Sequence, residues 1–181
     1  SPTLLTAKDQ TIENLVEDEN IRAIEQFQGK TYFSTFGEGL KKFDAEGIST
    51  LLAEPNIISL YNQDDKFLWI GTINKGVFVF DGKQILPKTE LDDLKSTAIQ
   101  AINGNEADGI SFATDKGLYF FKNNQLQIIL ANQNSRDVFT DRGTDGNLRI
   151  WCATENGLYN FMFNDNFGWI SSRIDIEQGL A

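Results

Sequence analysis

Short apolar runs separated by polar turns recur along the chain. In Phe67–Lys83, "FLWIGTINKGVFVFDGK", an apolar run is followed by a small polar turn, a second apolar run and Asp-Gly. Runs of this length, bounded by Gly, Asn and Asp, are typical of strands joined by tight turns. The pattern therefore predicts β-hairpins, and the segment "ELDDLK" at 90–95 predicts a helical turn.

A glycine marks the same position in each of four units. Gly39, Gly76, Gly117 and Gly157 each begin an apolar run, and their successive spacings are 37, 41 and 40 residues. Each unit also has an earlier apolar segment and a weaker later one, so we interpret it as four short strands, A to D. The glycine then follows the B–C turn and is expected to adopt a positive φ. A Thr precedes each glycine and a Phe follows it, at Thr35, Thr72, Thr114 and Thr154, and at Phe43, Phe80, Phe121 and Phe161.

A repeated four-stranded unit of about 40 residues is the sequence signature of a β-propeller blade. One twisted sheet cannot bury both of its apolar faces alone, whereas blades stacked around an axis bury them against one another. We therefore predict an all-β fold, with a single β-propeller domain or fragment over residues 1–181. Its four-stranded blades are expected at approximately 20–55, 56–95, 96–134 and 135–176.

Two further positions that align between the four units, here called columns, indicate how the blades pack. A small residue precedes each Thr and is expected to let neighbouring blades approach closely, at Ser34, Gly71, Ala113 and Ala153. Two positions earlier lie Tyr32, Trp69, Ser111 and Trp151. Because the two Trp residues lie within strands, we expect packing between blades in preference to stacking on sugar rings. The recurrent Phe is expected in the core.

The stretches "LWIGTINKGVFVFD" and "TDGNLRIWCATENGLYNF" resemble the two-component regulator propeller repeat. That repeat reads as an Asp/Gly/Asn turn, then Leu-Trp-Ile-Gly-Thr, a short turn, Gly-Leu and an aromatic-rich strand. The resemblance covers nearly the whole chain from about Thr11, although the first unit lacks the Trp and the third has Ser111 in its place. WD40 repeats fit less well, because their Gly-His signature cannot occur in a chain without His.

This resemblance implies a sensory role outside the cytoplasm. In that family the propellers form the periplasmic sensing part of bacterial sensor kinases, many of them in carbohydrate-responsive systems. Family propellers have more blades per ring, and the closing "EQGLA" resembles the start of a further repeat. Two alternatives follow. The chain is a fragment of a longer sensor, which would associate with itself or with other blades of the same protein, or its four units close into a small ring.

Composition excludes several classes of function. The chain has a formal net charge of −10 and no His. An acidic surface is unsuited to phosphate backbones, so we expect no nucleic-acid partner. Ser-His and Cys-His nucleophiles and His-ligated zinc or haem cannot form. The single Cys152 is expected to be a small buried hydrophobe. The chain has no run of 18 apolar residues, so we expect no membrane segment.

Asp- and Asn-rich turns raise the question of calcium. The turns Asn62–Lys66, Asp141–Asn147 and Phe163–Gly168 lack the EF-hand spacing and its terminal Glu. Asp and Asn are also ordinary turn residues, so we expect no metal and no cofactor. The segment Thr144–Trp151, "TDGNLRIW", resembles an Asp-box hairpin, whose Asp is expected to hold the turn. No carboxylate pair lies in a distinctive motif, so we expect no catalytic residue. A hydrolase or lyase is the least favoured alternative.

We predict a ligand-binding surface at the end of the propeller where the B–C and D–A loops gather. Its mixture of amide, carboxylate and ammonium groups suits a carbohydrate or another polar small ligand. The alternatives are that these turns are merely solvated, or that the propeller is a scaffold for protein–protein interaction or self-association without a small ligand. The candidate residues are Phe36, Glu38, Asn74, Lys75, Asp115, Lys116, Glu155 and Asn156.

Overall fold

Sixteen strands form four antiparallel sheets in the computed structural model, which describes residues 20–86, 88–164 and 166–174. Sheet 1 contains β1 (Ile21–Phe27), β2 (Lys30–Thr35), β3 (Gly39–Asp44) and β4 (Gly47–Leu52). Sheet 2 contains β5 (Ile57–Gln63), β6 (Phe67–Thr72), β7 (Val77–Phe80) and β8 (Ile85–Leu86). Sheet 3 contains β9 (Ile99–Asn105), β10 (Gly109–Thr114), β11 (Gly117–Lys122) and β12 (Gln125–Ala131). Sheet 4 contains β13 (Ser135–Arg142), β14 (Leu148–Thr154), β15 (Gly157–Asn164) and β16 (Gly168–Ile174).

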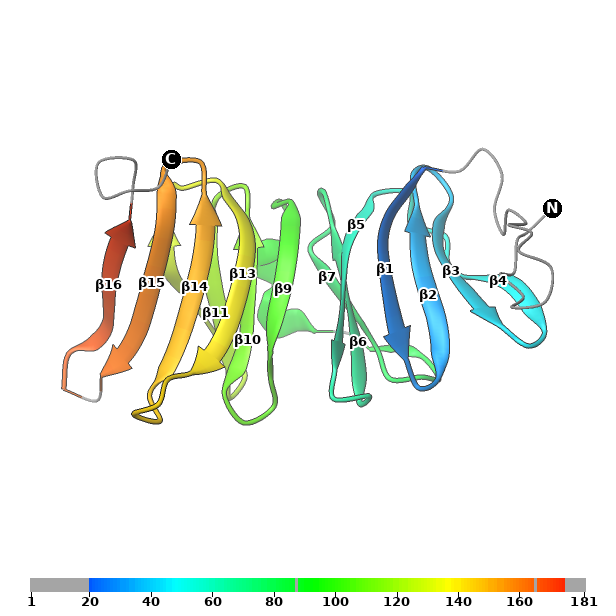
Figure 1. Ribbon diagram of the computed structural model, residues 1–181. Coiled ribbons are helices and arrows are strands. Elements are labelled where there is room, and N and C mark those ends of the chain that lie inside the picture. The colour runs from blue at the N-terminus through cyan, green and yellow to red at the C-terminus, as the bar shows by residue number, and fades with distance from the viewer. Residues whose placement is uncertain (1–19, 87, 165, 175–181) are drawn as a thin grey trace, which may run out of the picture.

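The four sheets lie side by side, with sheets 1 and 4 at opposite ends of the row (Figure 1). Within each sheet the strands follow chain order, and the first strands β1, β5, β9 and β13 pack next to one another. The predicted all-β propeller fold, with four four-stranded blades, is confirmed. The described residues form an open row of blades and not a closed ring.

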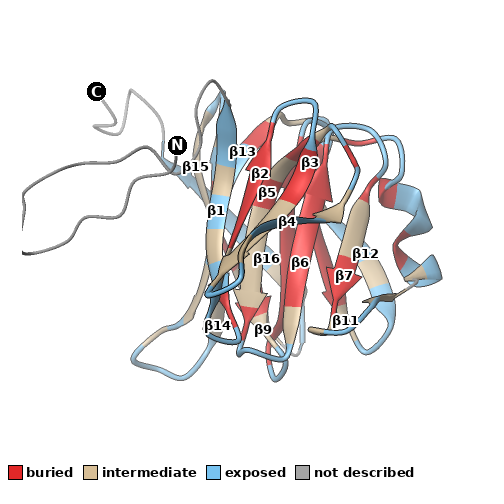
Figure 2. Ribbon diagram, turned by 90° about the vertical axis from the view of Figure 1, so that its right-hand side faces the viewer, coloured by how far each residue is buried: buried red, intermediate tan, exposed pale blue. Residues whose placement is uncertain are grey.

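Burial is concentrated where one sheet faces the next. In Figure 2 the buried residues lie mainly in strands such as β2 and β6, whereas β4 and β12 are intermediate or exposed. One apolar cluster fills each interface. Between sheets 1 and 2 the cluster is built around Phe27, Tyr32, Leu68 and Phe80. Between sheets 2 and 3 it contains Trp69, Ile99, Phe112 and Phe121, and between sheets 3 and 4 Leu118, Phe120, Val138 and Phe161.

The small-residue column faces the following sheet, as predicted. A Cβ added to Gly71 would lie 2.8 Å from the side chain of Ile99, which belongs to the next sheet. Ala113 is fully buried in the cluster shared with sheet 4. The equivalent Ala153 is exposed, because no sheet covers that face of sheet 4 among the described residues. The small residues Gly71 and Ala113 therefore let the next sheet pack closely against their own.

The recurrent aromatic residues are likewise buried where a neighbouring sheet covers them and half-buried where none of the described sheets does. Trp69 packs against Phe112 of the next sheet with ring centroids 5.7 Å apart, which confirms its packing role. Trp151 lies half-buried on the uncovered face of sheet 4. In the Phe column, Phe80, Phe121 and Phe161 are buried, whereas Phe43 in sheet 1 is half-buried. Cys152 is fully buried, as expected of a small hydrophobe.

The helical turn predicted at 90–95 is a 3-10 helix, η1 (Thr89–Leu94). Its Leu91 and Leu94 are buried in the cluster between sheets 2 and 3. No helix in the part of the chain that the structure describes is long and apolar enough to cross a membrane. The segment "EQGLA" lies outside the described residues.

Candidate functional site

The four B–C turns lie at the same end of their blades, together with the connections between sheets, and this end is called the B–C end. In each sheet the first residue of the B–C turn donates its backbone N–H to the carbonyl of the residue just before strand A. The four bonds are Phe36 to Asn20 at 2.9 Å, Ile73 to Asn56 at 2.9 Å, Asp115 to Ala98 at 3.2 Å and Glu155 to Asn134 at 3.2 Å. The same backbone bond thus joins the B–C turn and the D–A connection in every blade.

The Thr and Gly columns shape these turns. In the last three sheets the Thr hydroxyl donates to the carbonyl of the recurrent glycine at 2.9 Å, across the turn. The same hydroxyl accepts a backbone N–H from within the turn, as from Lys116 at 3.1 Å and from Asn156 at 3.1 Å. All four recurrent glycines have a positive φ, which confirms that prediction and explains why glycine is needed there.

In sheet 1 the predicted residues contact their own surroundings. Phe36 is 57% exposed, and the Arg22 guanidinium lies 5.1 Å from its ring centroid. Glu38 forms an ion pair with Lys41 at 2.6 Å. Both pairs are local to one blade.

In sheet 2 one predicted residue reaches a neighbouring loop. The Lys75 ammonium lies 2.6 Å from the carboxylate of Glu54, which is only 5% exposed and belongs to the connection between sheets 1 and 2. A buried carboxylate needs such a partner. Lys75 therefore has a structural task, whereas Asn74 in the same turn is exposed.

In sheet 3 both predicted side chains bond to the D–A connection. Asp115 accepts the backbone N–H of Ala98 at 2.9 Å. Lys116 donates to the carbonyl of Ser96 at 2.6 Å. These contacts hold the D–A connection against the B–C turn.

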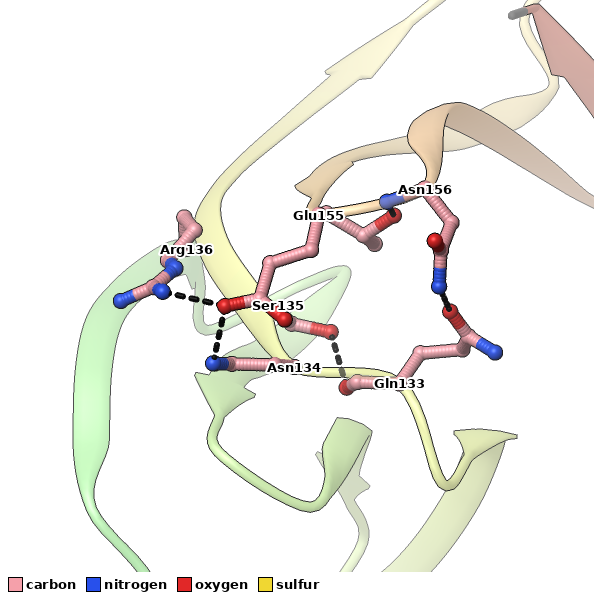
Figure 3. A network of polar contacts seen from close by, with 7 residues as sticks. Gln133, Asn134, Ser135, Arg136, Glu155 and Asn156 are labelled. Atoms are coloured by element: carbon pink, nitrogen blue, oxygen red, sulfur yellow. Dashed lines mark hydrogen bonds and ion pairs between the residues drawn. The ribbon is translucent and has the colours of Figure 1, made fainter.

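Sheet 4 carries the most extensive polar network at this end (Figure 3). The Glu155 carboxylate accepts from Asn134 Nδ2 at 2.8 Å and forms an ion pair with Arg136. Asn156 Nδ2 donates to Gln133 Oε1 at 2.7 Å. Arg136 and Glu155 are 54% and 51% exposed, so the ordered groups remain open to solvent. Asn134 Oδ1 is buried and accepts no hydrogen bond from the described residues.

The structure brings Glu155 and Asn156 together and leaves the other candidates in separate turns. The network also includes Gln133, Asn134 and Arg136, which were not among the predicted residues. All three belong to or adjoin the D–A connection. A run of polar residues directly before strand A, at the loop-rich end of the blade, was the available signal.

At the opposite end of the blades the Asp carboxylates accept backbone N–H groups, within one turn or from the neighbouring sheet. Asp145 accepts the backbone N–H of Asn147 at 3.1 Å, which confirms the turn-holding role and lowers the pKa of the carboxyl. Asp65 accepts the backbone N–H of Gln28 in sheet 1 at 3.0 Å, and this bond lowers its pKa as well. Within the described ranges, no group of three or more Asp, Glu or Cys side chains is arranged to hold a metal ion.

Comparison with known proteins places the fold. No protein-family model matches the sequence, and no curated protein matches it. Several solved structures do match this chain. An extracellular domain of a hybrid two-component system from B. thetaiotaomicron matches with a TM-score of 0.67 and 15% identity, over 92% of this chain and 24% of that one. A second extracellular domain of this kind from the same organism matches with a TM-score of 0.64 and 16% identity, over 87% and 22% of the two chains.

The chain shares the fold of these extracellular domains. The resemblance to the sensor propeller repeat is thereby confirmed at the level of the fold. The chain spans about a quarter of the length of these neighbours. An ancestral GH74 enzyme also matches, with a TM-score of 0.66 and 6% identity over 86% of this chain and 27% of that one. The fold alone therefore assigns neither a sensory nor a catalytic role.

Proposed function

We propose that this chain is a non-enzymatic, ligand-binding propeller module of a bacterial two-component signalling protein, acting outside the cytoplasm. The observation that carries the proposal is the match over 92% of the chain to the extracellular domain of a hybrid two-component system. The repeat resemblance in the sequence supports the same role independently. The absence of His and the turn-holding roles of Asp65 and Asp145 favour binding over catalysis.

The ligand surface is proposed at the B–C end, centred on the network of sheet 4. This network presents a guanidinium, a carboxylate and amides whose positions are set before a ligand arrives (Figure 3). Preorganised groups of this kind lower the entropy lost on binding. Amides and charged groups together suit the hydroxyls of a carbohydrate, which both donate and accept hydrogen bonds. A polar small ligand of this class is therefore proposed.

The double variant Arg136→Ala/Asn156→Ala tests this surface. We expect it to weaken binding of a neutral oligosaccharide about thirtyfold, because two hydrogen bonds of roughly 1 kcal/mol each are removed. Titration calorimetry with cello-, xylo- and malto-oligosaccharides measures the effect. Lys83→Ala, an exposed lysine at the opposite end of sheet 2, is the matched control and should bind as the wild type does. Equal affinities in all three proteins, or no binding by the wild type, would contradict the proposal.

A second candidate function is self-association, and the uncovered face of sheet 4 favours it. Cross-strand register places Phe139, Trp151, Asn160 and Ser172 in one line across that face. Phe139 is 57% exposed. In sheet 3 the equivalent face is covered by sheet 4, where Asn103 Oδ1 accepts the backbone N–H of Thr140 at 2.8 Å.

Two polar atoms on the uncovered face also lack partners. Asp141 Oδ1 and Asn160 Nδ2 are buried and have no hydrogen-bond partner among the described residues. A buried polar atom without a partner is destabilising, so the packing around this face is incomplete. The occupant proposed is sheet 1 of a second copy, packed in the same way as sheets 1 to 4 pack on one another.

Phe139→Asp tests this association. We expect the wild-type chain to show a mass that rises with concentration in analytical ultracentrifugation, since head-to-tail contacts need not close. Phe139→Asp should shift that mass to the monomer, because a carboxylate is costly to bury in an apolar interface. Ile128→Asp is the matched control, as Ile128 is 58% exposed on β12. A wild-type monomer at all concentrations, or equal effects of both variants, would rule this function out.

A further inference from the structure

A cleft between sheets 2 and 3 lies at the opposite end from the B–C turns. Its volume is about 240 Å³, and it is bordered by the A–B turns of both sheets and by the C–D turn of sheet 3. Its apolar lining comes from both sheets and includes Phe67, Ile110 and Phe121. The volume is below the range of about 300–1,000 Å³ that is usual for drug-sized ligands, so the cleft suits a molecule with a single ring.

One polar side chain is almost completely buried in the wall of this cleft. Gln63 is only 4% exposed, and its Oε1 accepts the indole N–H of Trp69 at 2.7 Å. An indole N–H can only donate, so this bond fixes which side of the amide carries Oε1 and which carries Nε2. That Nε2 donates to no other described residue, and it is not sealed from solvent. Gln63 therefore offers the cleft a fixed hydrogen-bond donor that lacks an acceptor.

The remaining amides of the lining are less available to a ligand. Asn105 donates to the Asp108 carboxylate at 2.9 Å and accepts the backbone N–H of the same residue at 2.8 Å. Asn123 and Asn124 are exposed in the C–D turn of sheet 3. A sugar has hydroxyls around its whole ring, and in this cleft most of them would face apolar side chains. A ligand with one polar group and an apolar body therefore fits better.

Three charged residues line the cleft, and two of them interact with charges of their own surroundings. Glu106 forms an ion pair with Lys66 of sheet 2. The ammonium of Lys122 and the carboxylate of Asp108 attract each other. The third charged residue is Lys88, in the connection between β8 and η1.

Lys88 is the charge that remains for a ligand. Its ammonium forms no ion pair or hydrogen bond with another described residue. The residue before it, at position 87, lies outside the described residues and is a proline, which carries no charge. Lys88 is half-buried, so a charge paired with it is screened less than at an open surface. An ammonium and an amide donor thus line one cleft, and both are suited to a carboxylate.

We infer that this cleft binds a small aromatic carboxylate, a single ring that carries one carboxyl group. The carboxylate accepts a hydrogen bond from Gln63 Nε2 and pairs with Lys88, while the ring packs against Phe67 and Phe121. The site lies at the other end of the blades from the B–C surface. It goes beyond the proposed function and does not rest on it.

Titration calorimetry with benzoate, 4-hydroxybenzoate and phenylacetate tests the inference. Benzamide is the neutral counterpart, and acetate is a carboxylate without a ring. We expect at least one aromatic acid to bind about tenfold or more tightly than both of these, because each of them lacks one of the two parts that the cleft recognises.

Two variants separate the two donors. Gln63→Glu keeps an acceptor for Trp69 but replaces Nε2 by a carboxylate oxygen, so it should weaken binding of the aromatic acid about tenfold or more. Lys88→Gln removes the ammonium and should weaken binding about fivefold. Lys83→Gln changes an exposed lysine outside the lining and is the matched control, which should bind as the wild type does. A thermal melt checks that each variant is folded.

Three results would overturn the inference: none of the aromatic acids binds, benzamide or acetate binds as tightly, or either Lys88→Gln or a folded Gln63→Glu binds as the wild type does. If Gln63→Glu does not fold, Lys88→Gln alone decides. The B–C variant Arg136→Ala/Asn156→Ala should retain the aromatic acid. Failure of this cleft and failure of the B–C surface are therefore distinguishable.

Discussion

Phe112→Ala is expected to lower the free energy of unfolding by about 3–5 kcal/mol. Phe112 is fully buried between sheets 2 and 3, where its ring lies 5.7 Å from that of Trp69. Truncation removes apolar contacts from both sheets and leaves a cavity that rigid strands cannot close. A domain of ordinary stability has about 5–15 kcal/mol in total, so this single change removes a large share. Urea denaturation followed by tryptophan fluorescence measures it.

Phe36→Ala is the matched control for this cavity. Phe36 is 57% exposed in the first B–C turn, and its one described ring contact is with Arg22. A cation–π contact at an exposed site contributes about 0.5–1 kcal/mol, so the loss should stay below about 1 kcal/mol. If both variants unfolded at the same urea concentration, the inter-sheet cluster would not be the main source of stability.

Gly117→Ala is expected to destabilise the protein by more than about 3 kcal/mol. Gly117 has a φ of +149°, a backbone conformation that L-residues with a side chain adopt only under strain of about 1–3 kcal/mol. An added Cβ would also lie 2.0 Å from the carbonyl oxygen of Leu130 on β12. That oxygen belongs to the backbone of the paired strand, so relief requires β11 and β12 to separate. Urea denaturation gives the size of the change.

Gly146→Ala separates the cost of a positive φ from the cost of the steric contact made by an added Cβ. Gly146 also has a positive φ, +78°, but nothing lies within 4 Å of the position that its Cβ would take. We expect only the conformational cost, about 1–2 kcal/mol. A Gly117→Ala loss no larger than that of Gly146→Ala would show that β12 gives way easily and that close strand approach matters little.

Much of the blade could be predicted from the sequence because it is specified locally. The Thr at the start of each B–C turn bonds to a glycine only three or four residues away. Asp145 bonds to Asn147 within one turn. The positive φ of the recurrent glycines is likewise a property of each turn. Features of this range recur in every unit, so four copies of the pattern reinforce one another.

The candidate site was predicted only in part. Glu155 and Asn156 were identified from the turn pattern, but their partner Gln133 comes from the preceding connection and their partner Arg136 from the start of β13. In the other turns the predicted groups serve the fold, as Lys75 does for the buried Glu54. Whether a polar turn residue faces solvent or a neighbouring loop depends on loop paths that the strand pattern does not contain.

The sequence by itself determined the number of blades, their four-stranded plan and the chemistry of their turns, because strand alternation and turn propensity act between residues close along the chain. Only the tertiary structure decided that the described blades form an open row, that no described sheet covers the far face of sheet 4, and that Trp169 of sheet 4 donates a hydrogen bond to Gln127 of sheet 3. These features join separate sheets. Their geometry is set by how twisted sheets pack face to face, which no single repeat encodes.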